Sequence, residues 1–380
     1  MPVSRRVFIA CAATSPLSLH FALTPAAASK DPLRDIIVIN TLGGFEDPNK
    51  TGPANPGDAA PIVTRRTVSD ARASGVTAIN QTLGYVLGKG DPYEQTLQSI
   101  AQWDQLIGQW PDDLLKVRSA ADIRAAKAGG KVGVIYGFQN SAMMGNDAKR
   151  VDQFAALGVR IIQLTYNNQN QLGGGSLAAG NPGLTDFGHE VVARLNAERI
   201  IVDLAHSGRQ TCLDAVRASK RPIAITHTGC GALLDHPRNK SDDELRQVAA
   251  GGGFVGIYFM PFLTKGRTPT SDDIVAHLEH ALSVCGEDHV GIGTDGSFTT
   301  VDDLETYRKH FAQEIAERRA AGISAPGEQE DILPFAIDMR GPDQLRKLFA
   351  KLSMRGHSSA RIEKVMGKNF FDYAANIWGG

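Results

Sequence analysis

A chain of 380 residues can form one large α/β domain or two average domains, and length alone does not decide between them. Hydrophobic residues make up 42% and charged residues 21%, values that are ordinary for a folded protein and exclude a disordered chain. Forty basic and forty-one acidic side chains give a formal net charge of -1, so no global field attracts nucleic acid or an anionic membrane. We therefore expect no nucleic-acid partner and a small, locally recognised ligand.

The N-terminus has the pattern of an export signal. Residues 4–9 read Ser-Arg-Arg-Val-Phe-Ile, a twin-arginine motif; a mildly apolar run follows as far as Leu23, and three alanines at 26–28 precede Ser29. This pattern predicts a Tat signal peptide over residues 1–28, the Tat export machinery as a partner, and a periplasmic mature protein. The apolar run is shorter than the roughly 20 residues that a membrane-spanning helix needs, so we expect no stable membrane anchor.

Beyond this segment, near-continuous apolar runs alternate with helical patterns, and the runs count to eight. Such runs are typical of parallel strands that are covered on both faces. Eight strand–helix repeats predict an α/β fold, a single (β/α)8 TIM-type barrel domain over residues 29–380. An open doubly wound sheet is the alternative, but no GxGxxG loop follows the first run. The expected strands are residues 36–40, 76–82, 132–138, 159–166, 200–206, 222–227, 254–259 and 290–295. The expected helices include residues 120–128, 150–157, 190–198, 212–218, 242–250 and 272–284.

Three of the expected strands end in residues of the types that bind metals. His206 closes the fifth strand, His227 the sixth and Asp295 the eighth, and the active site of such a barrel lies at the carboxyl ends of its strands. Imidazole and carboxylate are common zinc ligands, and three protein ligands with one open position suit a zinc ion that activates water. Any one of these residues could instead hydrogen-bond a loop. Asp203 should point to the other face of its strand, and we expect it to be structural.

Several segments of the chain resemble motifs of the membrane dipeptidase (renal dipeptidase) family, zinc hydrolases with an amidohydrolase-type barrel. They are residues 137–139, 202–207, 226–228, 236–239, 291–296 and 367–370, in the order in which the family has them. The resemblance implies that His206 and His227 hold a metal, that Arg238 binds a substrate carboxylate, and that Asp295 is a ligand or a proton acceptor. A guanidinium grips a carboxylate bidentately, which suits this role. An ion pair of Arg238 with one of the two aspartates at 242 and 243 is the alternative.

The departures from that family's pattern affect one half of the expected site. A His-x-Asp pair at the end of the first strand is replaced by Asn40 and Leu42, the bridging glutamate by Gln139, and a substrate-side histidine by Tyr166. With Asp295 as the one remaining carboxylate, two divalent cations would leave unpaired charge in a closed site. We therefore expect one divalent ion, zinc, rather than two. The expected metal ligands are His206, His227 and Asp295, and the expected substrate contacts are Arg238, Tyr166, Gln139 and Asn40.

Hydrolysis of a dipeptide or another small amide with a free carboxylate is the leading interpretation, with Asp295 orienting or deprotonating a water. Two alternatives stay open: a barrel that binds a ligand without catalysis, and a hydrolase of another small amide or lactone. The resemblance also allows a homodimer. Residues 307–340 are charged and then loop-like, which fits a lid, an interface or a plain excursion. The amide-rich residues 163–171 fit either ligand binding or an irregular loop.

Overall fold

A computed structural model describes residue 1 and residues 31–50, 63–320 and 324–379 of the chain. Residues 2–28 of the predicted signal peptide lie outside these described residues, so that prediction stays a prediction. The residues from Pro32 onward form one compact unit. No helix in the described part combines the length and the hydrophobicity that a membrane span requires.

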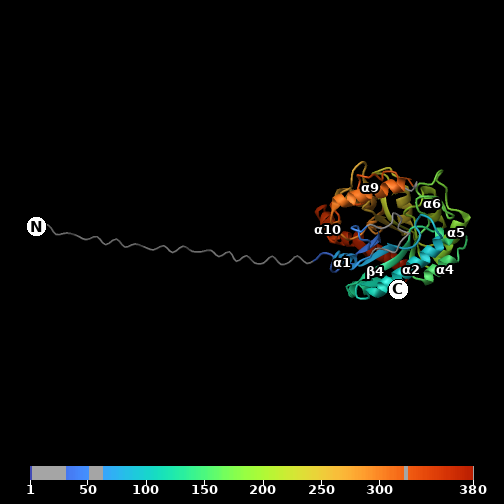
Figure 1. The fold of residues 1–380 in the computed structure, drawn as a ribbon, viewed down its shortest axis with the longest axis horizontal. Helices are drawn as coiled ribbons and strands as arrows, with labels where there is room; N and C mark the ends of the chain where they lie inside the picture. The colour runs from blue at the N-terminus through green and yellow to red at the C-terminus, as the bar shows by residue number, and fades with distance from the viewer. Residues whose placement is uncertain (2–30, 51–62, 321–323, 380) are drawn as a thin grey trace. The chain divides into compact units, whose positions relative to one another are not determined.

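Eight parallel strands follow one another around a barrel, in the order β1-β2-β4-β5-β6-β7-β9-β10. Figure 1 shows the helices arranged around the outside of these strands. The two edge strands meet through a parallel bridge between Gly44 and Ser297 and through the Asp295 amide, which donates to the Leu42 carbonyl at 2.9 Å. The barrel is therefore nearly closed, and the predicted (β/α)8 fold is confirmed. Its strands are β1 (Ile39–Gly43), β2 (Ala78–Thr82), β4 (Val132–Phe138), β5 (Val159–Gln163), β6 (Ile201–Asp203), β7 (Ala224–Cys230), β9 (Phe254–Ile257) and β10 (Val290–Ile292). Two short strands, β3 (Leu114–Val117) and β8 (Asn239–Lys240), pair with β4 and β7.

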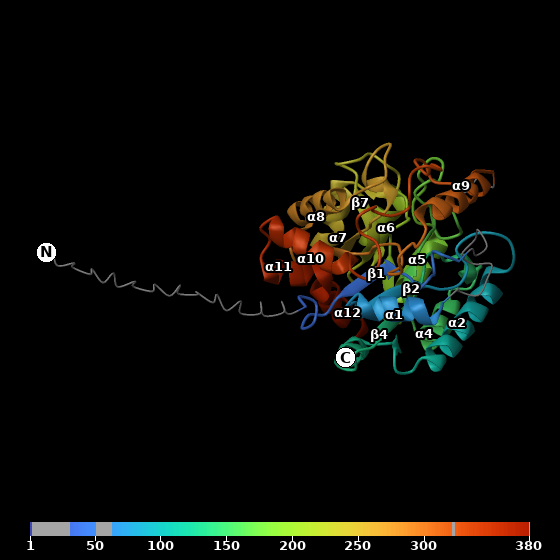
Figure 2. The ribbon, with the colours of Figure 1, turned by 60° about the vertical axis from the view of Figure 1, so that its left-hand side comes forward.

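Helices separate the strands, and capping residues fix where several of them begin. The Ser241 side chain accepts from the Glu244 amide, and the Glu244 carboxylate accepts from the Ser241 amide at 2.9 Å, a capping box that starts α7. The Asp91 side chain caps the start of α2, and Pro92 occupies the first position of that helix. The helices are α1 (Arg65–Ala73), α2 (Pro92–Gln109), α3 (Ala120–Ala128), α4 (Arg150–Ala156), α5 (Asp186–Ala197), α6 (Arg209–Ala218), α7 (Asp242–Ala250), α8 (Ser271–Cys285), α9 (Leu304–Ala320), α10 (Gln344–Met354), α11 (Ser359–Glu363) and α12 (Asn369–Trp378). Figure 2 shows α9 apart from α10, α11 and α12.

The strand ends differ from the predicted ones in a way that matters for the site. Strand β6 ends at Asp203, three residues earlier than predicted, because the Asp203 carboxylate accepts from the Ala205 and Thr226 amides and so turns the chain. This is the structural role that was expected of Asp203. Strand β7 instead continues to Cys230, so His227 lies within the strand and not at its end.

The side chain of Thr41, inside the barrel, joins strands below the site. The Thr41 hydroxyl lies 2.6 Å from the Thr226 carbonyl and 2.9 Å from the Ile292 carbonyl. Glycines make this approach possible, because a Cβ at Gly256 or at Gly293 would lie 2.1 Å from the Thr226 carbonyl. Strands β1, β7, β9 and β10 are thus held at fixed positions under the residues of the site.

Candidate active site

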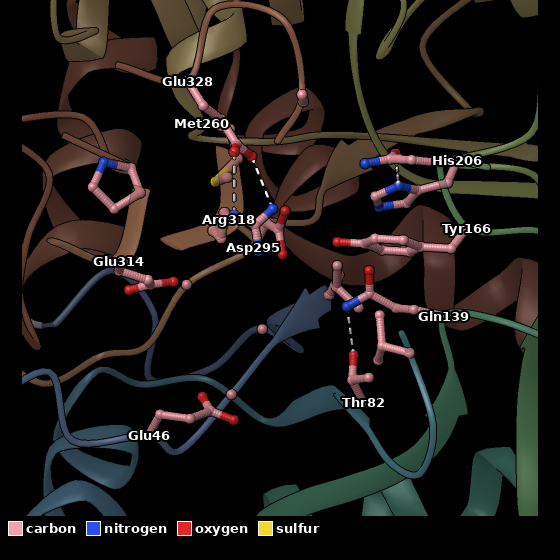
Figure 3. A pocket seen from close by; sticks show the side chains of 18 of the residues that line it. Glu46, Thr82, Gln139, Tyr166, His206, Met260, Asp295, Glu314, Arg318 and Glu328 are labelled. Carbon is pink, nitrogen blue, oxygen red and sulfur yellow. Dashed lines mark hydrogen bonds and ion pairs between the residues drawn. The ribbon is translucent and has the colours of Figure 1, made fainter. Parts of the chain in front are cut away.

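A cavity of about 470 Å³ lies at the carboxyl ends of the barrel strands (Figure 3). Every one of the eight barrel strands contributes a lining residue at or after its carboxyl end, from Gly44 after β1 to Asp295 after β10. This volume is in the range of small-molecule sites. The structure brings five of the seven predicted site residues into its lining: Gln139, Tyr166, His206, Arg238 and Asp295.

His206 is held as a neutral, oriented imidazole. Its Nδ1 lies 2.6 Å from the Asn167 side-chain oxygen, which can only accept, so Nδ1 carries the proton. Its Nε2 is buried and has no partner, and its ring stacks on Tyr166 with centroids 4.2 Å apart. Burial and the charge of Arg238 lower the pKa of His206 well below its usual value. Asn167 was not predicted; the amide-rich run around it was the one available signal.

His227 is a second neutral imidazole, placed behind the cavity wall. Its Nδ1 lies 2.9 Å from the Thr226 hydroxyl, whose own hydrogen is donated to Asp203 at 2.6 Å. The hydroxyl oxygen therefore accepts from His227 Nδ1–H, which leaves Nε2 as a bare lone pair. That Nε2 is buried without a partner, and burial lowers the pKa of His227 well below its usual value. The two histidine rings have centroids 5.0 Å apart.

The fit to a metal ion is partial. Two unpartnered, unprotonated Nε2 atoms on neighbouring imidazoles are suitable donors for one divalent ion, and each ring has the second hydrogen bond that orients metal-binding histidines. Among the described residues, however, no group of three or more His, Cys, Asp or Glu side chains is placed to hold a metal. The structure therefore supplies two of the three predicted ligands together and does not bring Asp295 into one group with them.

Arg238 is a buried cation without a carboxylate partner. Its guanidinium donates to the Ala205 carbonyl, its residue is 2% exposed, and no described Asp or Glu forms an ion pair with it. The aspartates at 242 and 243 pair with other side chains, which excludes the loop ion pair considered from the sequence. Because burying an unpaired charge is costly, the guanidinium is suited to an anion that enters the cavity.

Asp295 is held in an unusual backbone conformation. Its φ of 57° lies in the left-handed region, which costs a non-glycine residue about 1 kcal/mol or more and is concentrated at functional sites. Burial raises the pKa of Asp295 to about 6, and Arg238 opposes this shift. The carboxyl group therefore exchanges its proton near neutral pH, which is suitable for general base or acid chemistry.

Two further predicted residues lie on the cavity wall, and one does not. The Tyr166 hydroxyl points into the cavity toward Asp295, and burial raises its pKa, so it stays a hydrogen-bond donor (Figure 3). The Gln139 side-chain nitrogen donates to the Thr82 hydroxyl at 2.8 Å. Asn40 does not line the cavity, because its amide nitrogen and oxygen bond the hydroxyl and amide of Thr294, each at 2.8 Å. The structure gives Asn40 a structural role in place of the predicted substrate contact.

Helix α9 and several residues between 325 and 334 form a wall of the cavity. Phe311 and Ile315 line the cavity from α9, as do Arg318 and, from the following loop, Glu328. The last two form a bidentate ion pair at 3.1 and 3.2 Å with both side chains largely buried. His236, from the loop before Arg238, lies 2.5 Å through its Nε2 from the Pro326 carbonyl and ties this wall to the barrel.

The fold and the position of the cavity define a barrel protein whose chemistry is placed at the strand ends. The family model of the membrane dipeptidases (peptidase family M19) matches residues 64–324, which is more than half of the chain. The chain therefore belongs to the membrane dipeptidase family, whose members are metal-dependent hydrolases.

Individual relatives agree with this assignment. An amidohydrolase structure from Pseudomonas aeruginosa is 32% identical, with a TM-score of 0.76 over 92% of this chain and 98% of that one. A metallo peptidase from Rhodobacter sphaeroides, solved with a phosphinate mimic of L-Ala-D-Ala, is 19% identical and shows the same fold, with a TM-score of 0.70 over 90% of this chain and 99% of that one. Dipeptidase verJ from Clonostachys rogersoniana is 30% identical over 233 residues, and the match spans 60% of each protein.

Proposed function

We propose that this protein hydrolyses a dipeptide or another small amide with a free carboxylate, bound in the cavity at the strand ends. The observation that carries this proposal is Arg238, a buried guanidinium on the cavity wall that forms no ion pair with any described carboxylate. A ligand carboxylate would supply the missing counter-charge and accept two parallel hydrogen bonds. The P. aeruginosa relative is named an amidohydrolase and verJ a dipeptidase, which supports amide hydrolysis as the reaction.

Different residues of the cavity can perform the successive steps of such a hydrolysis. Arg238 anchors the carboxylate and fixes the amide carbonyl over the strand ends. Asp295, ionised above about pH 6, accepts a proton from the attacking water as the water oxygen bonds the carbonyl carbon. The Tyr166 hydroxyl donates a hydrogen bond to the oxygen on which negative charge develops. The proton held by Asp295 then passes to the leaving nitrogen as the carbon–nitrogen bond breaks.

We also propose that His206 and His227 are the two protein ligands of one divalent ion, zinc. Their unprotonated, unpartnered Nε2 atoms support this proposal. A divalent ion would supply Lewis-acid polarisation of the carbonyl or of the water. Metal content of the native protein, purified without added zinc, tests it beside the double variant His206→Ala/His227→Ala. About one equivalent that the double variant lacks agrees with the proposal; no metal in either protein, or two equivalents in the native one, contradicts it.

Turnover tests the proposed reaction. Dipeptides are compared in matched pairs, in which one member has a free carboxylate and the other a C-terminal amide. Each is incubated with zinc-equilibrated protein, and the released amine is measured. N-acyl amino acids extend the set to amides without a free amino group. Hydrolysis of the free-carboxylate member of a pair, at least about tenfold faster than that of its amide, agrees with the proposal. No release from any compound rejects hydrolysis.

A second candidate function is ligand binding without catalysis. It is favoured by one observation, namely that no described group of three potential ligands is placed for a metal. Zinc-equilibrated protein would then bind free-carboxylate dipeptides tightly in calorimetry and release no amine from any of them. Any sustained turnover that is lost in Asp295→Asn excludes this candidate.

We further propose that the protein is exported by the Tat machinery and acts in the periplasm. The support is the twin-arginine motif at Arg5 and Arg6 and the alanines at 26–28. Fractionation of cells that produce the full chain tests this, with the double variant Arg5→Lys/Arg6→Lys as the control. The proposal predicts mature protein in the periplasmic fraction and its loss from that fraction in the variant. Equal distribution of both proteins would contradict it.

A further inference from the structure

The proposed reaction uses one side of the cavity and leaves the acidic opposite side without a role. Glu46, in the loop after β1, and Glu314, on α9, line the cavity on the side away from His206 and Tyr166 (Figure 3). Neither carboxylate forms an ion pair with a described Lys, Arg or His side chain, although Lys50 lines the same cavity. Two segments that lie far apart in the sequence thus place carboxylates, without an ion pair among the described residues, on the same side of one cavity.

A buried acceptor beside Glu46 points independently to a ligand that donates hydrogen bonds. Gln81, at the end of β2, is 3% exposed and lines the cavity. Its side-chain nitrogen donates to Glu46 at 3.1 Å and to the Thr82 carbonyl at 3.0 Å, which uses both of its hydrogens. Its side-chain oxygen is buried and has no partner. An unpaired buried acceptor is costly, and an N–H group in the cavity would satisfy it.

The charges around the two carboxylates do not already neutralise them. Arg318, one helical turn beyond Glu314, is engaged in its bidentate pair with Glu328. Burial raises the pKa of Glu314, and the charge of Glu46 raises the pKa of Asp295. Both glutamates are nevertheless exposed to solvent, so each attracts a cation only as strongly as a partly screened charge does.

We propose that the ligand carries a cationic group, an ammonium or a guanidinium, at the end remote from its carboxylate, and that Glu46 and Glu314 select for it. The Gln81 oxygen accepts one of its hydrogen bonds. This inference rests on the proposed function, because Arg238 fixes which end of the ligand is the carboxylate. It names the substrate class as a dipeptide or amide whose amino-side residue is positively charged.

Binding measurements with a matched set of peptides test the inference without requiring turnover. The set is Lys-Ala, Met-Ala and Glu-Ala, which share one carboxylate end, and their N-acetyl forms. Dissociation constants are measured by calorimetry on the full protein and on Glu46→Gln, Glu314→Gln and the double variant. Glu317→Gln on the same helix, which does not line the cavity, is the matched control.

The expected result is that Lys-Ala binds most tightly and Glu-Ala most weakly. Each single variant should reduce the preference for Lys-Ala over Met-Ala by about two- to fivefold, as partly exposed ion pairs do, and the double variant by more, with no change in Glu317→Gln. Acetylation removes the α-ammonium and leaves the lysine side chain, so N-acetyl-Lys-Ala should keep its preference over N-acetyl-Met-Ala. Loss of that preference would contradict selection of the side-chain cation.

Equal binding of the three peptides by the native protein, or an unchanged preference in the double variant, would overturn the inference and leave the proposed function intact. Binding of none of the peptides would reject the proposed function together with the inference. Glutamine keeps the size of glutamate and one acceptor oxygen, and the affinity for Met-Ala in each variant shows that the variant is folded.

Discussion

Replacing Arg238 with methionine should remove most of the affinity for a carboxylate ligand while the protein stays folded. Truncating one partner of a buried, hydrogen-bonded charge pair costs about 2–5 kcal/mol, which corresponds to a roughly 30- to 4,000-fold increase in Kd. The folding cost is smaller, because the variant also removes a buried cation that forms no ion pair with a described carboxylate. The lost bond to the Ala205 carbonyl costs about 1–3 kcal/mol, and relief from the buried charge offsets part of this.

A double-mutant cycle with the ligand measures this effect. Calorimetry compares a dipeptide and its C-terminal amide on the native protein, on Arg238→Met and on Arg238→Lys, with the exposed Arg246→Met as the control. Native protein should prefer the carboxylate, Arg238→Met should bind both ligands alike, and Arg238→Lys should fall between them, because an ammonium lacks the planar fork. Retention of the full carboxylate preference in Arg238→Met would refute the reasoning.

Three other perturbations have defined outcomes. Because burial raises the pKa of Asp295 to about 6, the ionised base is lost as the pH falls through that value. The kcat/KM should therefore drop tenfold per pH unit below about pH 6 and level off above it, and Asp295→Asn should abolish turnover. A flat profile of kcat/KM between pH 5 and 7 would contradict this role. Asn167→Ala removes the oxygen that accepts from Nδ1 of His206 and orients the ring. The affinity for a divalent ion, measured by competition with a chelator, should fall 10- to 100-fold. Unchanged affinity would argue against metal binding at His206. Glu328→Gln leaves the largely buried Arg318 without its ion pair and should lower the free energy of unfolding, measured in urea, by about 1–3 kcal/mol. The double variant Arg318→Gln/Glu328→Gln should recover part of this loss. An unchanged free energy of unfolding in the single variant would show that the ion pair contributes nothing.

The barrel could be predicted because its signal is local. Strands covered on both faces need long apolar runs, and these runs are visible without any knowledge of tertiary contacts. Helix α9 could not be predicted in the same way. Its buried face is reduced to Phe311 and Ile315, because it packs over a cavity and not against a continuous core. A short apolar face gives no clear helical period.

The site was predicted where chemistry depends on residue type and was missed where it depends on packing. Asp295 stands out as a carboxylate at the end of a predicted strand, Arg238 was implied by the resemblance to the membrane dipeptidases, and both line the cavity. Asn40 looks similar in sequence, but closure of the barrel places Thr294 beside it and uses its amide. His227 was expected at a strand end, yet β7 continues past it and buries it behind the wall. Such differences follow from the stagger of the strands, which sequence does not display.

A crystal structure of the protein with a non-hydrolysable lysyl dipeptide analogue tests the central claim most directly. The account predicts the analogue in the cavity, with its carboxylate on the Arg238 guanidinium and its cationic group between Glu46 and Glu314. A carboxylate bound away from Arg238, a reversed ligand, or an analogue outside the cavity would contradict it.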